Sequence, residues 1–201
     1  MNHLLSTAVT SALFNYLNGI SLMSTGLKKH LLETIKIEQF KKGDVLVFTG
    51  QSCDHLYFIY RGLIAGYIGQ GKSRKCTWFH KEGNVVMSVE SFYNRVPSPE
   101  DIVAVEDSIL VSISFAELEE TYVLYPEFNV HGRLLLQRYY PIWVSMHYSV
   151  RYNNALNKYK FFMKVFPDFI GRMPYKAIAS FIGISHTYLS QLLNGSNVSK
   201  S

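Results

Sequence analysis

The sequence predicts an α+β fold with helices at the N-terminus, a β-roll or jelly-roll domain in the middle and helices at the C-terminal end. Three observations support this order. Residues 2–18 place apolar side chains at helical spacing. Residues 37–114 contain short β-rich runs separated by glycine turns. From residue 115 onward the helical spacing returns. A length of 201 residues leaves room for one large domain and one small one.

The N-terminal segment is expected to form two helices. Residues 2–18 form the first, which Gly19 ends, and residues 27–35 fit a second, shorter helix. The apolar positions of the first helix lie three and four residues apart, which gives one buried face. These positions are Leu5, Val9, Ala12, Leu13, Tyr16 and Leu17.

The β-rich middle is expected to form a sandwich or barrel, because many short strands follow one another closely. Gly43, Gly50 and Gly62 lie at turns where a left-handed backbone is expected, which only glycine adopts without strain. The clearest strand candidates are residues 45–48, 56–60, 63–68, 76–79 and 109–113.

Helical character returns at Phe115, where Ser114 and Glu117 form a predicted capping box. Residues 126–159 then form a long helical stretch. Two heptad registers within it indicate a helix that pairs with a copy of itself. Pro141 argues against a straight helix, because a proline in the interior destabilises a helix by about 3 kcal/mol. The alternative is a helix that packs only on its own β-domain. The heptad positions are Leu135, Ile142 and Ser149 in one register and Tyr139 and Met146 in the other.

Residues 174–193 predict a helix-turn-helix unit. Pro174 suits the first turn of a helix, Gly183 suits its left-handed end, and Ser185 is a good N-cap for the next helix. Two short helices joined by a glycine-containing turn define this unit. The alternative is an ordinary helical hairpin in a small all-α domain. Apolar positions that hold the two helices together are Ile178, Ile182, Ile184, Leu189 and Leu192.

The charge distribution separates the C-terminal end from the rest. Residues 158–201 hold six Lys or Arg and one Asp, whereas residues 1–157 hold 14 basic and 14 acidic residues. The formal charge of +5 therefore lies entirely in the last 44 residues. A basic module on a neutral body suggests a polyanionic partner, although a solvated tail would show the same charge.

Composition excludes several classes of protein. Two cysteines give no disulfide framework, and no apolar run approaches the roughly 18 residues of a membrane helix. The N-terminus lacks the basic start of a signal peptide. We therefore expect a cytoplasmic protein with no membrane partner. We expect no enzyme, because phosphate-binding glycine loops and nucleophile or zinc-protease motifs are absent.

The glycine turns of residues 40–51 and the run Tyr57-Phe58-Ile59-Tyr60-Arg61-Gly62 resemble the cyclic-nucleotide-binding β-roll of the Crp/Fnr family of transcription regulators. Residues 172–190 resemble the DNA-binding end of the same family. The resemblance implies a sensor domain at residues 1–125, a dimerisation helix at 126–157 and a helix-turn-helix domain at 158–201. It also implies a homodimer that binds double-stranded DNA, with RNA polymerase as a further partner.

The effector pocket that this resemblance implies lies at Val86, Met87, Ser88, Arg95 and Ser98. Ser88 stands where cyclic-AMP-binding members carry Glu, and Ser98 where they carry the phosphate-binding Arg, so cyclic AMP is not expected by the usual chemistry. Arg95 could substitute in a reshaped loop, or be a solvated arginine. The effector is left unknown. The pairs Cys53–His55 and Cys76–His80 match no zinc motif, and no metal site is expected.

The second helix of the predicted unit would enter the major groove of DNA. Gln191 could pair with adenine and Thr187 could contact a thymine methyl group, whereas the absence of arginine disfavours guanine readout. The sequence thus predicts a DNA-binding regulator. The alternative is a ligand-sensing or protein-interaction module that has lost DNA binding. The candidate DNA-contacting residues are Lys176, Ser185, His186, Thr187, Tyr188, Ser190 and Gln191.

Overall fold

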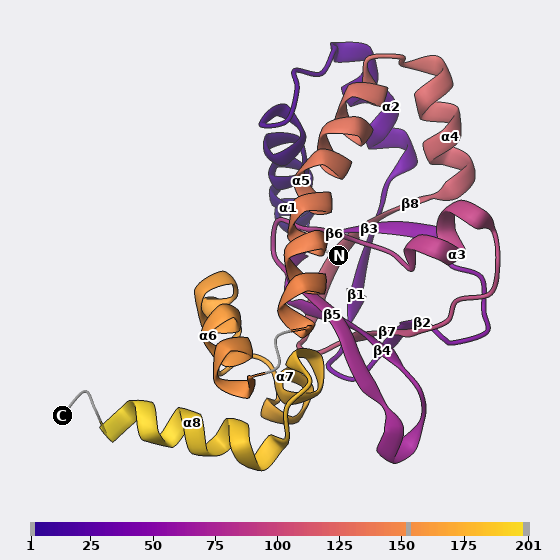
Figure 1. Cartoon of the computed structure of the whole chain (residues 1–201). Helices are drawn as coiled ribbons and strands as arrows, with labels where there is room; N and C mark the ends of the chain where they lie inside the picture. The colour runs from indigo at the N-terminus through magenta and orange to yellow at the C-terminus, as the bar shows by residue number, and fades with distance from the viewer. Residues whose placement is uncertain (1–2, 152–153, 199–201) are drawn as a thin grey trace.

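The computed structural model describes residues 3–151 and 154–198 (Figure 1). Helices flank a β-rich centre, as the sequence predicts. The helices are α1 (His3–Asn18), α2 (Thr25–Thr34), α3 (Val89–Asn94), α4 (Phe115–Leu124), α5 (Phe128–Val150), α6 (Ala155–Val165), α7 (Tyr175–Ile182) and α8 (His186–Val198), with 3-10 turns at Gly71–Ser73 and Pro167–Phe169. The strands are β1 (Lys36–Phe40), β2 (Val45–Val47), β3 (His55–Arg61), β4 (Leu63–Ile68), β5 (Lys75–Lys81), β6 (Val85–Val86), β7 (Asp101–Ala104) and β8 (Ser108–Ser114).

The strands of the described residues form two four-stranded antiparallel sheets, ordered β1-β8-β3-β6 and β2-β7-β4-β5. The predicted turn glycines are confirmed, since Gly43, Gly50 and Gly62 have φ angles of 96°, 87° and 111°. Alternation along the strands sends one set of side chains between the sheets. This shared core includes Tyr57, Ile59 and Leu110 from the first sheet and Ile64, Trp78 and Ile102 from the second.

The outer face of the first sheet is covered by α1, α2, α4 and the start of α5, which lie above the strands in Figure 1. The predicted buried face of α1 is confirmed at Val9, Leu13 and Leu17. Leu56 and Phe58 of β3 belong to the same apolar cluster. The first sheet is therefore covered on both faces.

The capping box that begins α4 is confirmed. Ser114 Oγ accepts a hydrogen bond from the Glu117 amide at 3.3 Å, and the Glu117 carboxylate accepts one from the Ser114 amide at 2.9 Å. The two bonds satisfy amides that the first helical turn leaves without helical partners.

Pro141 does not end α5, which continues to Val150. Gln137, whose carbonyl loses its helical partner at Pro141, is exposed, so solvent can satisfy that carbonyl. The predicted stretch of 126–159 is nevertheless not one helix. The side chain of Asn154 accepts a bond from the Leu156 amide and thereby begins α6 at Ala155.

The heptad positions of α5 mostly face their own chain. Tyr139 accepts a hydrogen bond from the Val85 amide at 2.9 Å, Met146 is buried, and Leu135 is half-buried. Ile142 is 37% exposed, and the Ser149 side chain lies outside the described part. Within one chain, these positions of α5 therefore pack on the β-domain, as the alternative interpretation of the heptad pattern expects.

The outer face of the second sheet is covered by α6 and α7, a contact that the sequence analysis did not predict. The centre of this contact is Phe79 of β5, which is 1% exposed. The Cys76 amide of the same strand donates to Ser180 Oγ of α7 at 2.9 Å. The Phe79 ring centroid lies 4.6 Å from that of Phe169, 4.7 Å from Phe181, 5.5 Å from Phe166 and 6.0 Å from Phe162.

Ion pairs border this aromatic cluster. Arg172 donates to both carboxylate oxygens of Glu82, at 2.9 and 3.0 Å, and to both of Glu106, at 2.7 and 3.1 Å. Lys81 of β5 pairs with Asp168. Forked pairs of this kind fix orientation as well as distance. Arg172 therefore holds the C-terminal helices in one orientation on the β-sandwich.

Within the described residues, no helix is long and apolar enough to cross a membrane.

Replacing Phe79 by Ala is expected to lower the free energy of unfolding by about 3 kcal/mol or more, because it removes a buried ring from the cluster that joins α6 and α7 to β5. Urea denaturation measures this loss. The matched control is Phe48→Ala, since Phe48 is 51% exposed. Equal stability of the two variants would contradict the proposed importance of the cluster.

Replacing Arg172 by Ala is expected to remove roughly 1–2 kcal/mol of stability at neutral pH. Burial tends to raise the pKa of Glu82, but hydrogen bonds from Arg172 and the Gly62 amide outweigh it and lower this pKa below 4.5. A carboxyl with a lowered pKa stabilises the fold above its unfolded pKa, and that contribution disappears as the pH falls through the folded pKa. Stability curves of wild type and variant should therefore approach each other as the pH falls below 4.5 and through the lowered pKa of Glu82.

A second group, which is present in both wild type and variant, lowers the stability of the fold at acid pH. Burial lowers the pKa of His80 to about 4, so the fold loses stability as the pH falls from 6.5 toward that value. Lys41→Ala serves as control, since it removes an exposed ion pair with Asp107. A constant gap between wild type and Arg172→Ala from pH 7 to 3 would contradict the assignment.

Candidate nucleic-acid interface and candidate effector pocket

The turn between α7 and α8 has the geometry that the sequence predicts. Gly183 is left-handed, with φ 66° and ψ 44°. The amide of Ile184 donates to the Ala179 carbonyl at 3.0 Å and that of Gly183 to the Ser180 carbonyl at 3.3 Å, which together form a Schellman ending. Ser185 caps the next helix, because its Oγ accepts from the Tyr188 amide at 3.1 Å.

The two helices hold each other through one apolar contact. Leu189 of α8 is fully buried, and Ile178 and Ile182 of α7 are buried in the same cluster. Small Ala179, which is 2% exposed, belongs to that cluster as well. The helix pair therefore has a defined angle rather than a loose connection.

The face of α8 opposite Leu189 is polar and uncharged. His186, Thr187 and Gln191 are exposed, whereas Tyr188 and Ser190 are half-buried. Ser185 is exposed too, but its hydroxyl is occupied by the cap. The exposed side chains offer hydrogen-bond donors and acceptors without a fixed charge, and they lie near the positive end of the helix dipole.

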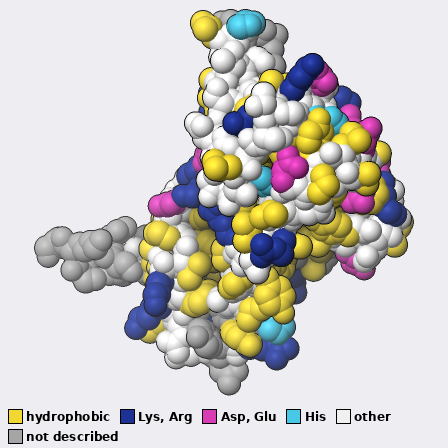
Figure 2. Space-filling view, turned by 90° about the horizontal axis from the view of Figure 1, so that it is seen from above, with side chains coloured by type: hydrophobic (Ala, Val, Ile, Leu, Met, Phe, Trp, Pro, Cys, Tyr) yellow, Lys and Arg dark blue, Asp and Glu magenta, His cyan; other side chains and the backbone are white. Residues whose placement is uncertain are grey.

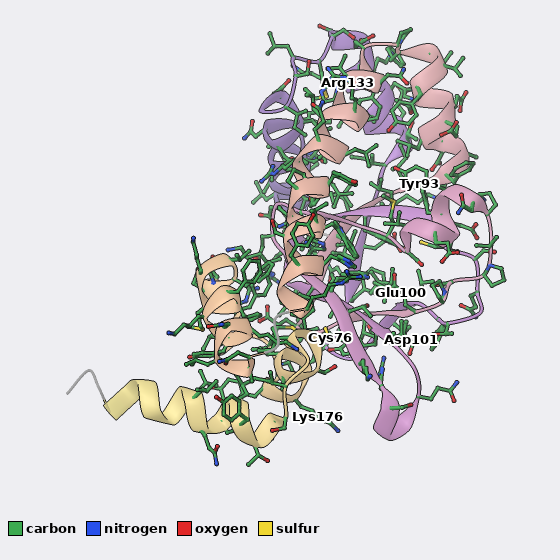
Figure 3. All side chains as sticks on the ribbon, viewed as in Figure 1. Cys76, Tyr93, Glu100, Asp101, Arg133 and Lys176 are labelled. Atoms are coloured by element: carbon green, nitrogen blue, oxygen red, sulfur yellow. The ribbon has the colours of Figure 1, made fainter. Side chains whose placement is uncertain are left out.

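Cations near this face come from other helices. Lys176 is exposed on α7, at the same end of the molecule as the start of α8 (Figure 3). Lys160 and Lys164 are exposed on α6, and Lys158 donates to the Gly183 carbonyl at 3.4 Å. Arg172 is engaged with Glu82 and Glu106, so it is not free for a phosphate.

The predicted effector pocket brings Ser88 and Ser98 together. Both side chains are buried, and their hydroxyl oxygens lie 3.0 Å apart. The Ser98 hydroxyl donates to the Glu100 carbonyl at 2.7 Å. Val86 is buried in β6 and pairs with Tyr57. These hydroxyls are thus used within the chain.

Trp78 and Glu100, two buried side chains that the sequence did not point to, form a hydrogen bond close to these serines. Trp78 Nε1 donates to Glu100 Oε2 at 2.8 Å, and Thr77 donates to the same oxygen at 3.2 Å. A Cβ on Gly66 would lie 2.3 Å from Trp78 Nε1, so only glycine leaves room for the indole. A glycine within a strand was the one available signal of this close approach.

Burial raises the pKa of Glu100, although hydrogen bonds from Trp78, Thr77 and Ser88 oppose the rise. The buried group beside Ser88 and Ser98 is therefore an acid and not a cation. A cyclic phosphate needs a positive partner, which neither serine supplies. The residues present do not fit a cyclic nucleotide held by arginine.

Arg95 ends the short helix α3 that Ser88 begins, and its side chain bonds to other groups of the chain. It has a left-handed backbone with φ 56°, and its guanidinium donates to the Cys53 carbonyl at 3.2 Å. It also pairs with Asp54 and lies 4.6 Å from the centre of the Phe115 ring. Met87 of the predicted pocket is half-buried and packs on the main apolar cluster. Arg95 and Met87 therefore do not hydrogen-bond to Ser88 or Ser98 through their side chains; Arg95 pairs with Asp54, and Met87 packs on the apolar cluster.

The two cysteines are buried, and each thiol bonds to a backbone carbonyl two residues further along the chain. Cys53 Sγ donates to the His55 carbonyl and Cys76 Sγ to the Trp78 carbonyl, both at 3.4 Å. Among the described residues, no group of three or more His, Cys, Asp or Glu side chains is arranged to hold a metal ion.

Comparison with known proteins agrees with this architecture. The family model of the cyclic nucleotide-binding domain matches residues 37–123. No curated protein matches the chain in sequence. The fold of FixK2 from Bradyrhizobium japonicum is similar, with a TM-score of 0.68 and 12% identity over 83% of this chain and 86% of that one.

Two further solved structures extend the likeness. A CooA mutant from Carboxydothermus hydrogenoformans gives a TM-score of 0.65, with 15% identity over 87% of this chain and 80% of that chain. The catabolite activator protein of Thermus thermophilus gives 0.52, with 13% identity over 90% and 87%. Residues 37–123 therefore have the fold of a cyclic nucleotide-binding domain, and the likeness to FixK2, CooA and the catabolite activator protein is one of fold.

Proposed function

We propose that this chain is a DNA-binding transcription regulator of the Crp/Fnr type that acts as a dimer and binds DNA through α8. The observation that carries the proposal is the geometry between α7 and α8. Gly183 ends one helix, Ser185 begins the next, and Leu189 fixes the angle between them. The proposal takes these two helices as a helix-turn-helix, in which the second helix enters the major groove.

The exposed side chains of α8 are the ones that we assign to contacts with DNA. Gln191 can pair with the edge of an adenine and Thr187 can contact a thymine methyl group. Lys176 supplies a phosphate contact that does not depend on sequence. Since the described part of α8 carries no arginine, bidentate guanine readout is not assigned.

The likeness to FixK2 and to a catabolite activator protein supports the proposal, because it extends over 83% and 90% of this chain and so beyond residues 37–123. The roles assigned are binding and regulation, not catalysis. A small effector is part of the proposal. The hydrogen bonds that Ser88 and Ser98 make within the chain, and the lack of a positive charge on either serine, argue against a cyclic nucleotide as that effector.

One observation favours the second candidate, a sensing or interaction module without DNA binding. Arg172, part of the basic C-terminal end, is neutralised by Glu82 and Glu106 within the chain. Each such internal pair reduces the charge available to a polyanion. The salt dependence of DNA binding separates the two candidates.

The full chain is expected to bind random duplex DNA at low salt, with an affinity that falls steeply as salt rises. Lys176→Ala should weaken this binding roughly three- to tenfold and reduce the slope of log K against log salt by about 1. Fluorescence anisotropy measures both quantities. The control Lys29→Ala, at an exposed position on α2, should leave them unchanged. No binding at 50 mM salt or below, roughly the low end of such titrations, would favour the second candidate.

Dimerisation is assigned to a face of α5 that the chain itself leaves uncovered. Leu136, Tyr140 and Trp143 are 58%, 72% and 45% exposed, and their spacing of four and three residues places them on one stripe. In Figure 2, hydrophobic and basic side chains are spread over the whole face seen from above, whereas most acidic side chains lie on its right-hand side. This stripe lies one position away from the heptad that the sequence suggested.

Replacing both Leu136 and Trp143 by Glu is expected to convert a dimer into a monomer, because the new charges would repel across a self-complementary interface. Light scattering coupled to gel filtration measures the mass. Val123→Glu is the matched control, since Val123 on α4 is 77% exposed and lies off the stripe. A wild-type monomer, or a double variant that stays dimeric, would contradict this assignment.

A further inference from the structure

A cavity of about 70 Å³ lies on the outer face of the first sheet, on the opposite side of that sheet from Trp78 and Glu100. Helices α1, α2, α4 and α5 line it together with strands β3, β6 and β8. Its walls are almost entirely apolar and include Leu17, Phe58, Ile113 and Leu135. Among the described residues, no Asp, Glu, Lys or Arg lines the cavity. A folded core this well covered seldom leaves a space of that size.

In the part of the chain that the structure describes, one polar atom that belongs to the lining, His131 Nδ1, is buried without a hydrogen-bond partner. His131 is fully buried. Its Nε2 lies 2.9 Å from the Ser21 carbonyl, which only accepts, so Nε2 carries the hydrogen. Nδ1 is therefore a free acceptor. Burial raises the pKa of Tyr16, and a hydrogen bond with Tyr139 raises it further, so Tyr16 has a partner within the chain.

A buried polar atom without a partner destabilises a fold by roughly 1–3 kcal/mol. Native proteins therefore pair such atoms, with water or a ligand if not with protein. A cavity whose walls are apolar offers water few further partners, whereas it suits a molecule that is mostly apolar and has one polar group. His131 Nδ1 selects a hydrogen-bond donor for that group.

We propose that this cavity binds a small neutral aromatic molecule with a single hydroxyl group, of the phenol class, whose hydroxyl donates to His131 Nδ1. The volume is about five times the 10–15 Å³ that one water needs, which suits a ligand of roughly five to eight non-hydrogen atoms. The rings of Phe58, Tyr122 and Phe128 line the cavity and favour an aromatic guest.

The cavity is placed to influence the rest of the chain. Phe128, His131 and Leu135 line it from α5, the helix that carries the exposed stripe and leads to α6. A ligand that fills the cavity would stabilise one position of α5. This regulatory role rests on the function proposed above, whereas binding itself does not.

Phenol and toluene provide a matched pair of probes, because they have the same shape and differ by a hydroxyl against a methyl group. Calorimetric titration of the full chain should show one saturable site per chain, with phenol bound about five- to tenfold more tightly than toluene. His131→Phe should abolish this preference. His147→Phe should preserve it, since His147 is exposed farther along α5.

Saturable binding of neither probe by the wild type would overturn the proposal and leave the cavity to water. Equal affinities for the two probes would overturn the role of His131. Should His131→Phe fail to fold, nuclear Overhauser contacts between phenol protons and the methyl groups of Leu17 and Leu135 in the wild type give the same answer. Contacts to other methyl groups instead would overturn the placement.

A separate experiment measures the affinity of the chain for random duplex DNA with and without saturating phenol. A shift in DNA affinity supports a regulatory role for the site. Phenol binding with no DNA binding under any condition would contradict the proposed function and leave the binding site standing.

Discussion

The burial of Phe79 is the constraint on which the arrangement of the chain depends. Its ring extends from β5 into a cluster of aromatic side chains from α6, α7 and the turn between them. Arg172 then fixes the orientation through two forked ion pairs with the β-domain. Because this contact is apolar at its centre and charged at its border, the C-terminal helices form a continuation of the β-sandwich rather than a separate body on a linker.

Strand β5 connects three parts of the molecule through its alternating side chains. Phe79 faces the C-terminal helices, whereas Trp78 faces the interior and donates to Glu100. His80 lies against the ring of Tyr139 on α5, with 5.7 Å between ring centres. A shift of this strand would therefore act at once on the interior of the sandwich, on α5 and on the helices assigned to DNA.

The sequence predicted the features that depend on neighbouring residues. The left-handed Gly183 and the capping residues Ser114 and Ser185 follow from local backbone chemistry. The features it missed join residues far apart in the chain, such as the pairing of Arg172 with Glu82. Arg172 lies in a basic segment, and its carboxylate partners lie 90 and 66 positions earlier in the chain. The cavity could not be predicted either, because its lining comes from helices and strands that are far apart in the sequence.

Hydrogen exchange at the Cys76 amide tests the docked arrangement most directly. This amide donates to Ser180 Oγ at 2.9 Å, so it reports on the contact between β5 and α7. The account predicts that it exchanges only through an opening that costs several kcal/mol, similar to the amides of its strand neighbours. Rapid exchange at Cys76, with its strand neighbours still protected, would show that the helices are not docked and would contradict the account.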